Sequence, residues 1–171
     1  MPESVENDKL ENEMKIYDFA PSTFRIFRDW LLGRRLPARY STTDVSKVNS
    51  SINNSVHMNL VQLYLFAFVY DVPQLRRDAL DAYMRHLGLH GILPTAAELL
   101  VAYETLLPDS PMIKFMVNFY ATMWDGVVLE KDEETWMELP ADFYMDLAIA
   151  GVKMRAPQGR FFAFCEYHEH S

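Results

Sequence analysis

Prolines separate a series of apolar stripes that recur at helical spacing along this chain of 171 residues. Proline suits the first turn of a helix, where its missing N–H has no intrahelical partner, but it disrupts a helix interior. The pattern therefore predicts five or six helices, in a mainly α fold with at most one or two short strands. The prolines at or just before the expected helix starts are Pro21, Pro73, Pro94, Pro111 and Pro140.

Two of these stripes are expected to pack together at the centre of the fold. The segment 60–70 is apolar around almost its whole circumference, which is typical of a buried helix. An earlier stripe ends at Gly33, which we expect to cap that helix in the left-handed conformation. We expect Trp30, on this earlier stripe, to pack against the segment 60–70. The stripe consists of Phe24, Phe27, Trp30 and Leu31.

Local signals predict where two further helices end and begin. An amphipathic helix that starts at Pro73 is expected to end at Gly88 and Gly91, because glycine weakens a helix and favours its C-terminal cap. Thr95 and Glu98 have the spacing of a capping box, in which each side chain accepts a hydrogen bond from a free backbone N–H. A helix is therefore expected to begin directly after Thr95.

The remaining segments are expected to be a loop, a short strand and a last helix. The segment 40–55 is rich in Ser, Thr and Asn, which predicts a flexible loop. The segment 15–19 alternates in part between polar and apolar residues and could form one short strand. The last helix is expected to follow Pro140. Its predicted apolar face consists of Phe143, Leu147, Ala148 and Val152.

The overall charge bears on the class of partner and on location. The net charge is −8 and the pI is near 5.0, so we expect no general nucleic-acid binding, which needs a basic face. Residues 1–14 contain five acids and one lysine; they are expected to be disordered and lack the pattern of a signal or transit peptide. The segment 60–70 is about half the length that crosses a bilayer. These features predict an intracellular protein, cytoplasmic or nuclear, that does not bind membranes.

The sequence contains no motif of a known catalytic or cofactor-binding site. Its six glycines are not spaced to form a phosphate-binding loop, and no serine lies in a nucleophile elbow. We therefore expect no catalytic residues, no bound cofactor and no enzymatic activity. An enzyme whose site has no local motif is an alternative, because helical folds can assemble such sites from distant residues.

One cluster of metal-ligand residue types lies near the C-terminus. A thiolate and two imidazoles, from Cys165, His168 and His170, are typical zinc ligands, and His86 or His90 could supply a fourth. The paired spacings of structural zinc sites are absent, so we expect no metal. A small metal-binding regulator that uses Cys165, His168 and His170 is the alternative function. The same segment is also consistent with an aromatic tail that packs into a groove through Phe161, Phe162, Phe164 and Tyr167.

Two blocks of the sequence resemble BTB/POZ domains. The segment 24–36, FRIFRDWLLGRRL, resembles the helix F-x-x-F-x-x-W-L-Y-x-G that follows the last core strand in this family. The segment 63–80, LYLFAFVYDVPQLRRDAL, resembles the family's next helix pair, L-Y-x-F-A-x-x-Y-x-I-P-x-L-x-x-x-A. The segments 139–143 and 165–170 are similar to the tail of the BTB proteins that fungi carry in many copies. The chain thus resembles a BTB/POZ protein of the fungal type.

The resemblance covers the helical second half of the BTB/POZ fold plus a helical extension, without the N-terminal half of strands and two helices. Together with the composition, it divides the chain into a disordered acidic segment at 1–14, a BTB-like half at 15–87, a helical extension at 88–154 and an aromatic, histidine-containing tail at 155–171. Either the gene model is truncated or the chain is a reduced, mostly helical derivative. The absent half normally supplies the dimerisation surface and much of the cullin-contacting surface, so self-association and a ubiquitin-ligase adaptor role are left open.

The absence of catalytic motifs, together with this resemblance, predicts a non-enzymatic protein–protein interaction module that acts as an adaptor or scaffold. Its partner is expected to be a protein, whose identity the sequence does not give.

Overall fold

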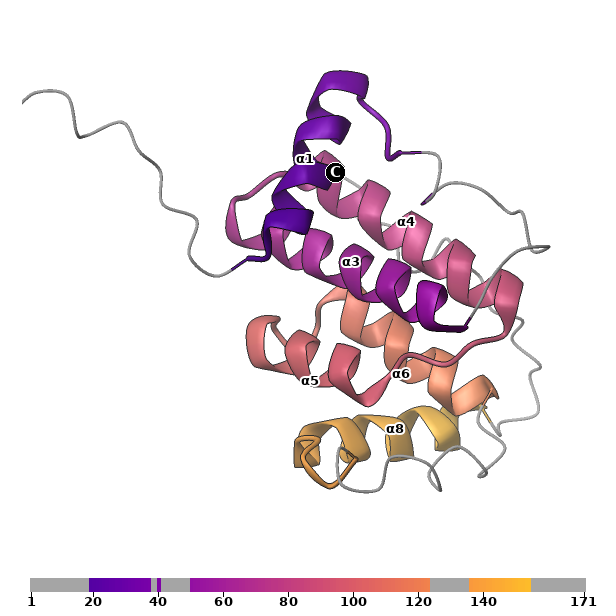
Figure 1. Cartoon of the computed structure of the whole chain (residues 1–171). Coiled ribbons are helices and arrows are strands. Elements are labelled where there is room, and N and C mark those ends of the chain that lie inside the picture. Colours follow the sequence, from indigo (N-terminus) through magenta and orange to yellow (C-terminus); the bar gives the residue numbers. More distant parts are fainter. Residues whose placement is uncertain (1–18, 38–39, 41–49, 124–135, 155–171) are drawn as a thin grey trace, which may run out of the picture.

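The computed structural model describes residues 19–37, 40, 50–123 and 136–154, and within these ranges the chain forms helices and no strand (Figure 1). The prediction of a mainly α fold is confirmed. The expected strand at 15–19 lies outside the described residues except for Phe19, and so do the segments 1–14 and 155–171. The helices are α1 (Pro21–Gly33), α3 (Ser50–Val69), α4 (Pro73–His90), α5 (Ala96–Thr105), α6 (Pro111–Met123) and α8 (Ala141–Met154).

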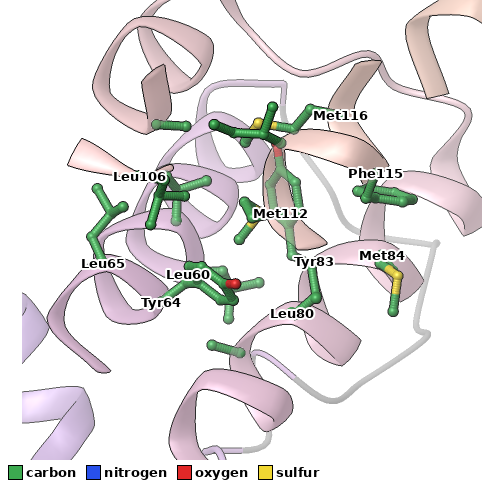
Figure 2. Close-up of a cluster of buried hydrophobic side chains, with 14 of the residues drawn as sticks. Leu60, Tyr64, Leu65, Leu80, Tyr83, Met84, Leu106, Met112, Phe115 and Met116 are labelled. Atoms are coloured by element: carbon green, nitrogen blue, oxygen red, sulfur yellow. The ribbon is translucent and has the colours of Figure 1, made fainter. Parts of the chain in front are cut away.

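Helix α3 is the central element of the fold, as its apolar circumference predicts. Its residues 60–67 are buried except Gln62, and the helix contacts α1, α4 and α5. Helices α3 and α4 lie side by side and are joined by the short turn before Pro73 (Figure 1). Figure 2 shows the core that they share with α6, where side chains from three helices interdigitate. Its labelled members include Leu60, Tyr64, Leu80, Tyr83, Met112, Phe115 and Met116.

Helix α1 packs on α3, but it buries a different face from the one predicted. Ile26 and Trp30 are buried, as is Thr23, whereas Phe24 and Leu31 are exposed. Residues 23, 26 and 30 follow the helical period just as the predicted stripe does, so both faces of α1 are apolar. The expectation that Trp30 lies in the core is confirmed, and the expectation that Phe24 and Leu31 do so is wrong.

Three helix ends also differ from the predictions. The left-handed residue after α1 is Arg34 (φ 51°), and Gly33 is the last helical residue. Helix α4 continues through Gly88 to His90 and is capped by Gly91 in the left-handed conformation (φ 59°). Helix α3 begins at Ser50, so the predicted loop at 40–55 is wrong for its last residues. A single glycine costs a helix only about 1 kcal/mol relative to alanine, which packing of α4 on α3 can outweigh.

The start of α5 follows the sequence signal closely. Thr95 and Glu98 form the predicted capping box, in which the Thr95 hydroxyl accepts a hydrogen bond from the Glu98 N–H and the Glu98 carboxyl accepts one from the Thr95 N–H. This local exchange satisfies two of the backbone donors that every helix start leaves without an intrahelical partner.

Helix α8 packs against α6 and completes a second cluster of aromatic side chains. The Phe143 ring lies 5.8 Å from that of Tyr120 and 6.2 Å from that of Trp136, between ring centroids. The hydroxyl of Tyr103 on α5 donates a 3.0 Å hydrogen bond to the Asp146 carboxylate. Of the predicted apolar face, Phe143 is buried and Leu147 half-buried, but Ala148 and Val152 are exposed, because α8 turns the side of Ala150 towards the core.

Candidate functional site on the outer face of α1

The side of α1 that faces away from α3 is both apolar and exposed. Phe24 and Leu31 lie seven residues apart on one stripe of the helix and are 46% and 45% exposed. Leu32, beside them, is 80% exposed. Because Ile26 and Trp30 fix the opposite side of α1 in the core, these three side chains have no route inward. Exposed apolar side chains that gather on one face are typical of binding surfaces.

Arginines surround this apolar patch. Arg25 and Arg28 are exposed on α1, and Arg34 and Arg35 follow directly after the helix. Arg28 donates hydrogen bonds of 3.1 and 2.8 Å to Asp29, which neutralises part of its charge. We call Phe24, Arg25, Arg28, Leu31 and Leu32 the α1 face. Its composition, with an apolar centre and guanidinium groups at the rim, matches the residue types enriched at protein–protein interfaces.

The α1 face is connected to the core by aromatic rings in contact. The Phe24 ring lies 6.0 Å from that of Phe27, which in turn lies 4.9 Å from the buried Phe66 ring of α3. The Phe66 ring also contacts Phe19, at 5.4 Å, and Tyr70, at 4.6 Å. Because these rings support one another from the surface to α3, the α1 face is held on a rigid base.

A positive group also covers the buried indole at the end of α1. The guanidinium of Arg34 lies 5.7 Å from the Trp30 ring centroid, within cation–π range. The left-handed backbone of Arg34 places it there, and its N–H donates a 2.6 Å hydrogen bond to the Trp30 carbonyl. This turn directs the chain away from α1 and keeps positive charge beside the α1 face.

Glu98 is the most perturbed carboxyl of the described residues, but its surroundings are those of a structural group. It is fully buried, and Tyr83 and the Thr95 N–H each donate a 3.0 Å hydrogen bond to its Oε2 atom. Burial raises the pKa of Glu98 to about 7, although both hydrogen bonds lower it. The same burial, with the adjacent Glu98, raises the pKa of Tyr83 well above its ordinary value. A carboxyl enclosed by its own helix cap is not exposed to a substrate.

Two histidines, His57 on α3 and His86 on α4, are buried near Tyr83, which donates a hydrogen bond to Glu98. The His57 ring of α3 lies 6.1 Å from the Tyr83 ring and 5.9 Å from the His86 ring of α4. Burial, together with the nearby His86 and His90, lowers the pKa of His57 to about 4. Burial also lowers the pKa of His86, whose Nε2 atom is 3.1 Å from the Tyr40 carbonyl. Both imidazoles are therefore neutral at pH 7.

The histidines do not form a metal site with other described residues. His86 and His90, which sequence analysis considers as a further zinc ligand, have ring centroids 5.9 Å apart and face each other as rings. Within residues 19–37, 40, 50–123 and 136–154 there is no group of three or more His, Cys, Asp or Glu side chains that could hold a metal ion. The candidate ligands Cys165, His168 and His170 lie outside the described residues.

The α1 face is the feature that sequence analysis misses. The spacing of Phe24 and Leu31 is visible in the sequence, but it predicts burial because apolar residues at helical spacing usually face a core. Ile26, which shares a second stripe with Trp30, shows in the sequence that α1 has two apolar sides, but it does not show which of them is buried.

None of the helices in the described part of the chain is both long enough and apolar enough to span a membrane. Comparisons with family models, with curated proteins and with solved structures found no match to this chain.

Proposed function

We propose that this chain is a non-enzymatic protein–protein interaction module of BTB/POZ-like type, and that the α1 face is its binding surface. The observation that carries this proposal is the exposure of Phe24, Leu31 and Leu32 on a helix whose other side is fixed in the core by Ile26 and Trp30. Burying this patch against another protein would remove apolar area from water, at about 25 cal/mol per Å².

The charge of the α1 face indicates the kind of protein that would bind. Arg25 and Arg28, with Arg34 and Arg35 nearby, make this region basic within a chain of net charge −8. A partner with an apolar ridge flanked by carboxylates fits it, because guanidinium groups pair with carboxylates in bidentate geometry. Nucleic acid fits less well, since the acidic remainder of the chain would repel phosphates.

The resemblance to BTB/POZ domains supports the same surface. In that family, a strand-rich half of the domain precedes the helix that α1 resembles. A helix of this type can therefore pack against the helical half on one side and against other protein on the other side. Trp30, from the W-L pair of the motif, faces the core here, and Phe24, from its first position, faces outward. An adaptor or scaffold needs an exposed binding surface such as the α1 face, and it does not need catalytic groups.

The buried titratable groups favour binding over catalysis. Glu98, His57 and His86 are enclosed in the bundle rather than placed on an exposed surface. A general acid or base must reach a proton on its substrate, within about 3 Å or through one water. These groups instead hold α3, α4 and α5 together.

The test uses a photo-crosslinking residue at position 32 in the full chain, with the same residue at position 107 as the matched control. Leu107 is also apolar and exposed, at 67%, but lies between α5 and α6. A protein captured from position 32 and not from 107 is then purified and its affinity measured. We expect Leu31→Asp to weaken binding at least tenfold and Leu107→Asp to leave it unchanged.

Charge reversal supplies a second readout. Arg25→Glu combined with Arg28→Glu should weaken the same complex, and the loss should shrink at high salt, where charge attraction is screened. Equal capture from positions 32 and 107, or an affinity unaffected by Leu31→Asp, would overturn the proposal.

A further inference from the structure

Helix α8 has a second apolar side that no described residue covers. Met145 is 64% exposed, Ile149 47% and Val152 74%, and these residues recur at helical spacing on one stripe. Ala141 and Ala148 lie on the same stripe and are exposed. We call these five residues the α8 face. It lies opposite Phe143 and Ala150, which are buried on the side that packs against α6.

The α8 face differs in chemistry from the α1 face. Its five residues carry no charge. The charged residues of α8 lie to one side of the stripe, where Asp146 accepts the hydrogen bond from Tyr103. An apolar stripe along an exposed helix is a typical site for a covering segment or partner. In Figure 1, α8 lies at the edge of the helical stack, so anything that covers the α8 face comes from outside the described helices.

The sequence directly after α8 has the composition of such a cover. Residues 155–171 follow the helix, and Pro157 with Gly159 disfavours its continuation. The next residues are Arg160 and the run Phe161-Phe162-Ala163-Phe164. In an extended conformation Phe162 and Phe164 project to the same side, which suits a flat apolar surface. The aromatic run 161–164 and the α8 face are therefore two apolar features that lie close together in the sequence and could cover each other.

The connecting length permits this contact within one molecule. Helix α8 has 14 residues and is about 21 Å long. Residues 155–160, fully extended, reach about 20 Å, so the aromatic run can return along the whole helix. A tether this short gives an effective concentration in the millimolar range, whereas a second molecule has to lose translational and rotational freedom to bind.

We propose that residues 160–167 of the same chain dock on the α8 face, with Phe162 and Phe164 covering Met145 and Ile149. The docked segment runs back from the end of α8 towards its start, so that Phe162 lies over Ile149, Phe164 over Met145, and Glu166, on the same side of the segment, near Ala141. This inference concerns a different surface from the α1 face and does not rest on the proposed function.

The test moves the only cysteine of the chain to the side of the segment that faces α8: Cys165→Ser is combined with Glu166→Cys, because residue 166 projects to the same side as Phe162 and Phe164. In this full-length background, Ala141→Cys or Met145→Cys places a second thiol on the α8 face, opposite the new thiol at position 166. Leu32→Cys is the matched control, since Leu32 is 80% exposed on α1 at the opposite end of the stack (Figure 1). Mild oxidation should form an intramolecular disulfide in at least one α8 variant, seen as a monomer that has lost two free thiols. The control should retain its thiols.

A second measurement avoids any change to α8. A spin label on Cys165 of the otherwise unaltered chain should broaden the amide signals of residues 145–152 far more than those of α1, and Phe162→Ser with Phe164→Ser should remove this broadening. Disulfide-linked dimers in place of monomers would show that a second copy covers the α8 face. Dimers, or broadening no stronger at α8 than at α1, would each overturn the proposal.

Discussion

The indole Nε1–H of Trp30 donates a 2.7 Å hydrogen bond to Oδ2 of Asp78, which joins α1 to α4 across 48 positions of the sequence. The same carboxylate accepts a 2.8 Å hydrogen bond from Gln74 one helical turn earlier, so Asp78 is held in place to receive the indole. Trp30 is thus fixed twice, by its ring in the core and by its polar edge.

Trp30→Ala should destabilise the fold by about 3–5 kcal/mol, because it removes a large buried ring together with this bond. The measurement is urea-induced unfolding of the full chain. Trp30→Phe is the matched variant: it keeps most of the ring and loses the hydrogen bond, which should cost less than Trp30→Ala. A loss below about 1 kcal/mol for Trp30→Ala would show that the indole does not carry the packing of α1.

The two sides of α1 should respond differently to truncation. Ile26→Ala, on the buried side, should lower the free energy of unfolding by about 2–5 kcal/mol. Phe24→Ala, on the exposed side, should cost clearly less although it removes more atoms, since nearly half of that side chain is already in contact with water. The comparison uses the same unfolding assay, and equal losses would contradict the orientation of α1.

His57 should make the fold less stable as the solution becomes acidic. Its pKa is about 4 in the folded chain and about 6.5 when unfolded, so the unfolded chain binds the extra proton first. The stabilisation is complete above pH 6.5 and is lost as the pH falls towards 4, by up to about 1.4 kcal/mol per pH unit. His57→Phe should reduce this acid sensitivity, measured as unfolding free energies at pH 4.5, 5.5 and 6.5. Identical pH dependence in the two proteins would count against the buried neutral imidazole.

The contribution of Glu98 to fold stability should have the opposite pH dependence and decrease as the pH rises. Its pKa is about 7 in the folded chain against an ordinary value of 4.5, so the folded chain holds the proton longer. Its stabilisation is complete below pH 4.5 and is lost as the pH rises through 7. Glu98→Gln, which keeps an oxygen to accept the cap hydrogen bond, should make stability rise more steeply with pH between 4.5 and 7 than in the parent chain. A shallower rise would show that Glu98 is ionised in the folded state.

The parts of the fold that depend on neighbouring residues could be predicted from the sequence. The Thr95–Glu98 cap needs only residues three positions apart, and the burial of residues 60–67, except Gln62, follows from their apolar circumference. The direction in which α1 and α8 face could not be predicted, because each has two apolar sides and the helical period does not rank them. Ile26 and Ala150 proved decisive only through docking on α3 and α6.

The candidate site likewise depends on contacts between residues that are far apart in the sequence. The hydrogen bond from Trp30 to Asp78, far along the chain, is one of the contacts that hold the buried side of α1 inward. The neutral state of His57 depends on its enclosure between α3 and α4, which no local pattern in the sequence encodes. The candidate ligands Cys165, His168 and His170 stay a prediction, since they lie outside the described residues.

Because α3 contacts α1, α4 and α5, an incomplete chain that lacks any of these helices leaves part of the apolar surface of α3 exposed. Until α4 and α5 have been synthesised, apolar side chains of α3 stay exposed, and the nascent chain is prone to aggregate. Shortened versions that end before α5, or that begin after α1, should therefore collect in the insoluble fraction of an expression host. We therefore expect the helices to fold as one cooperative unit.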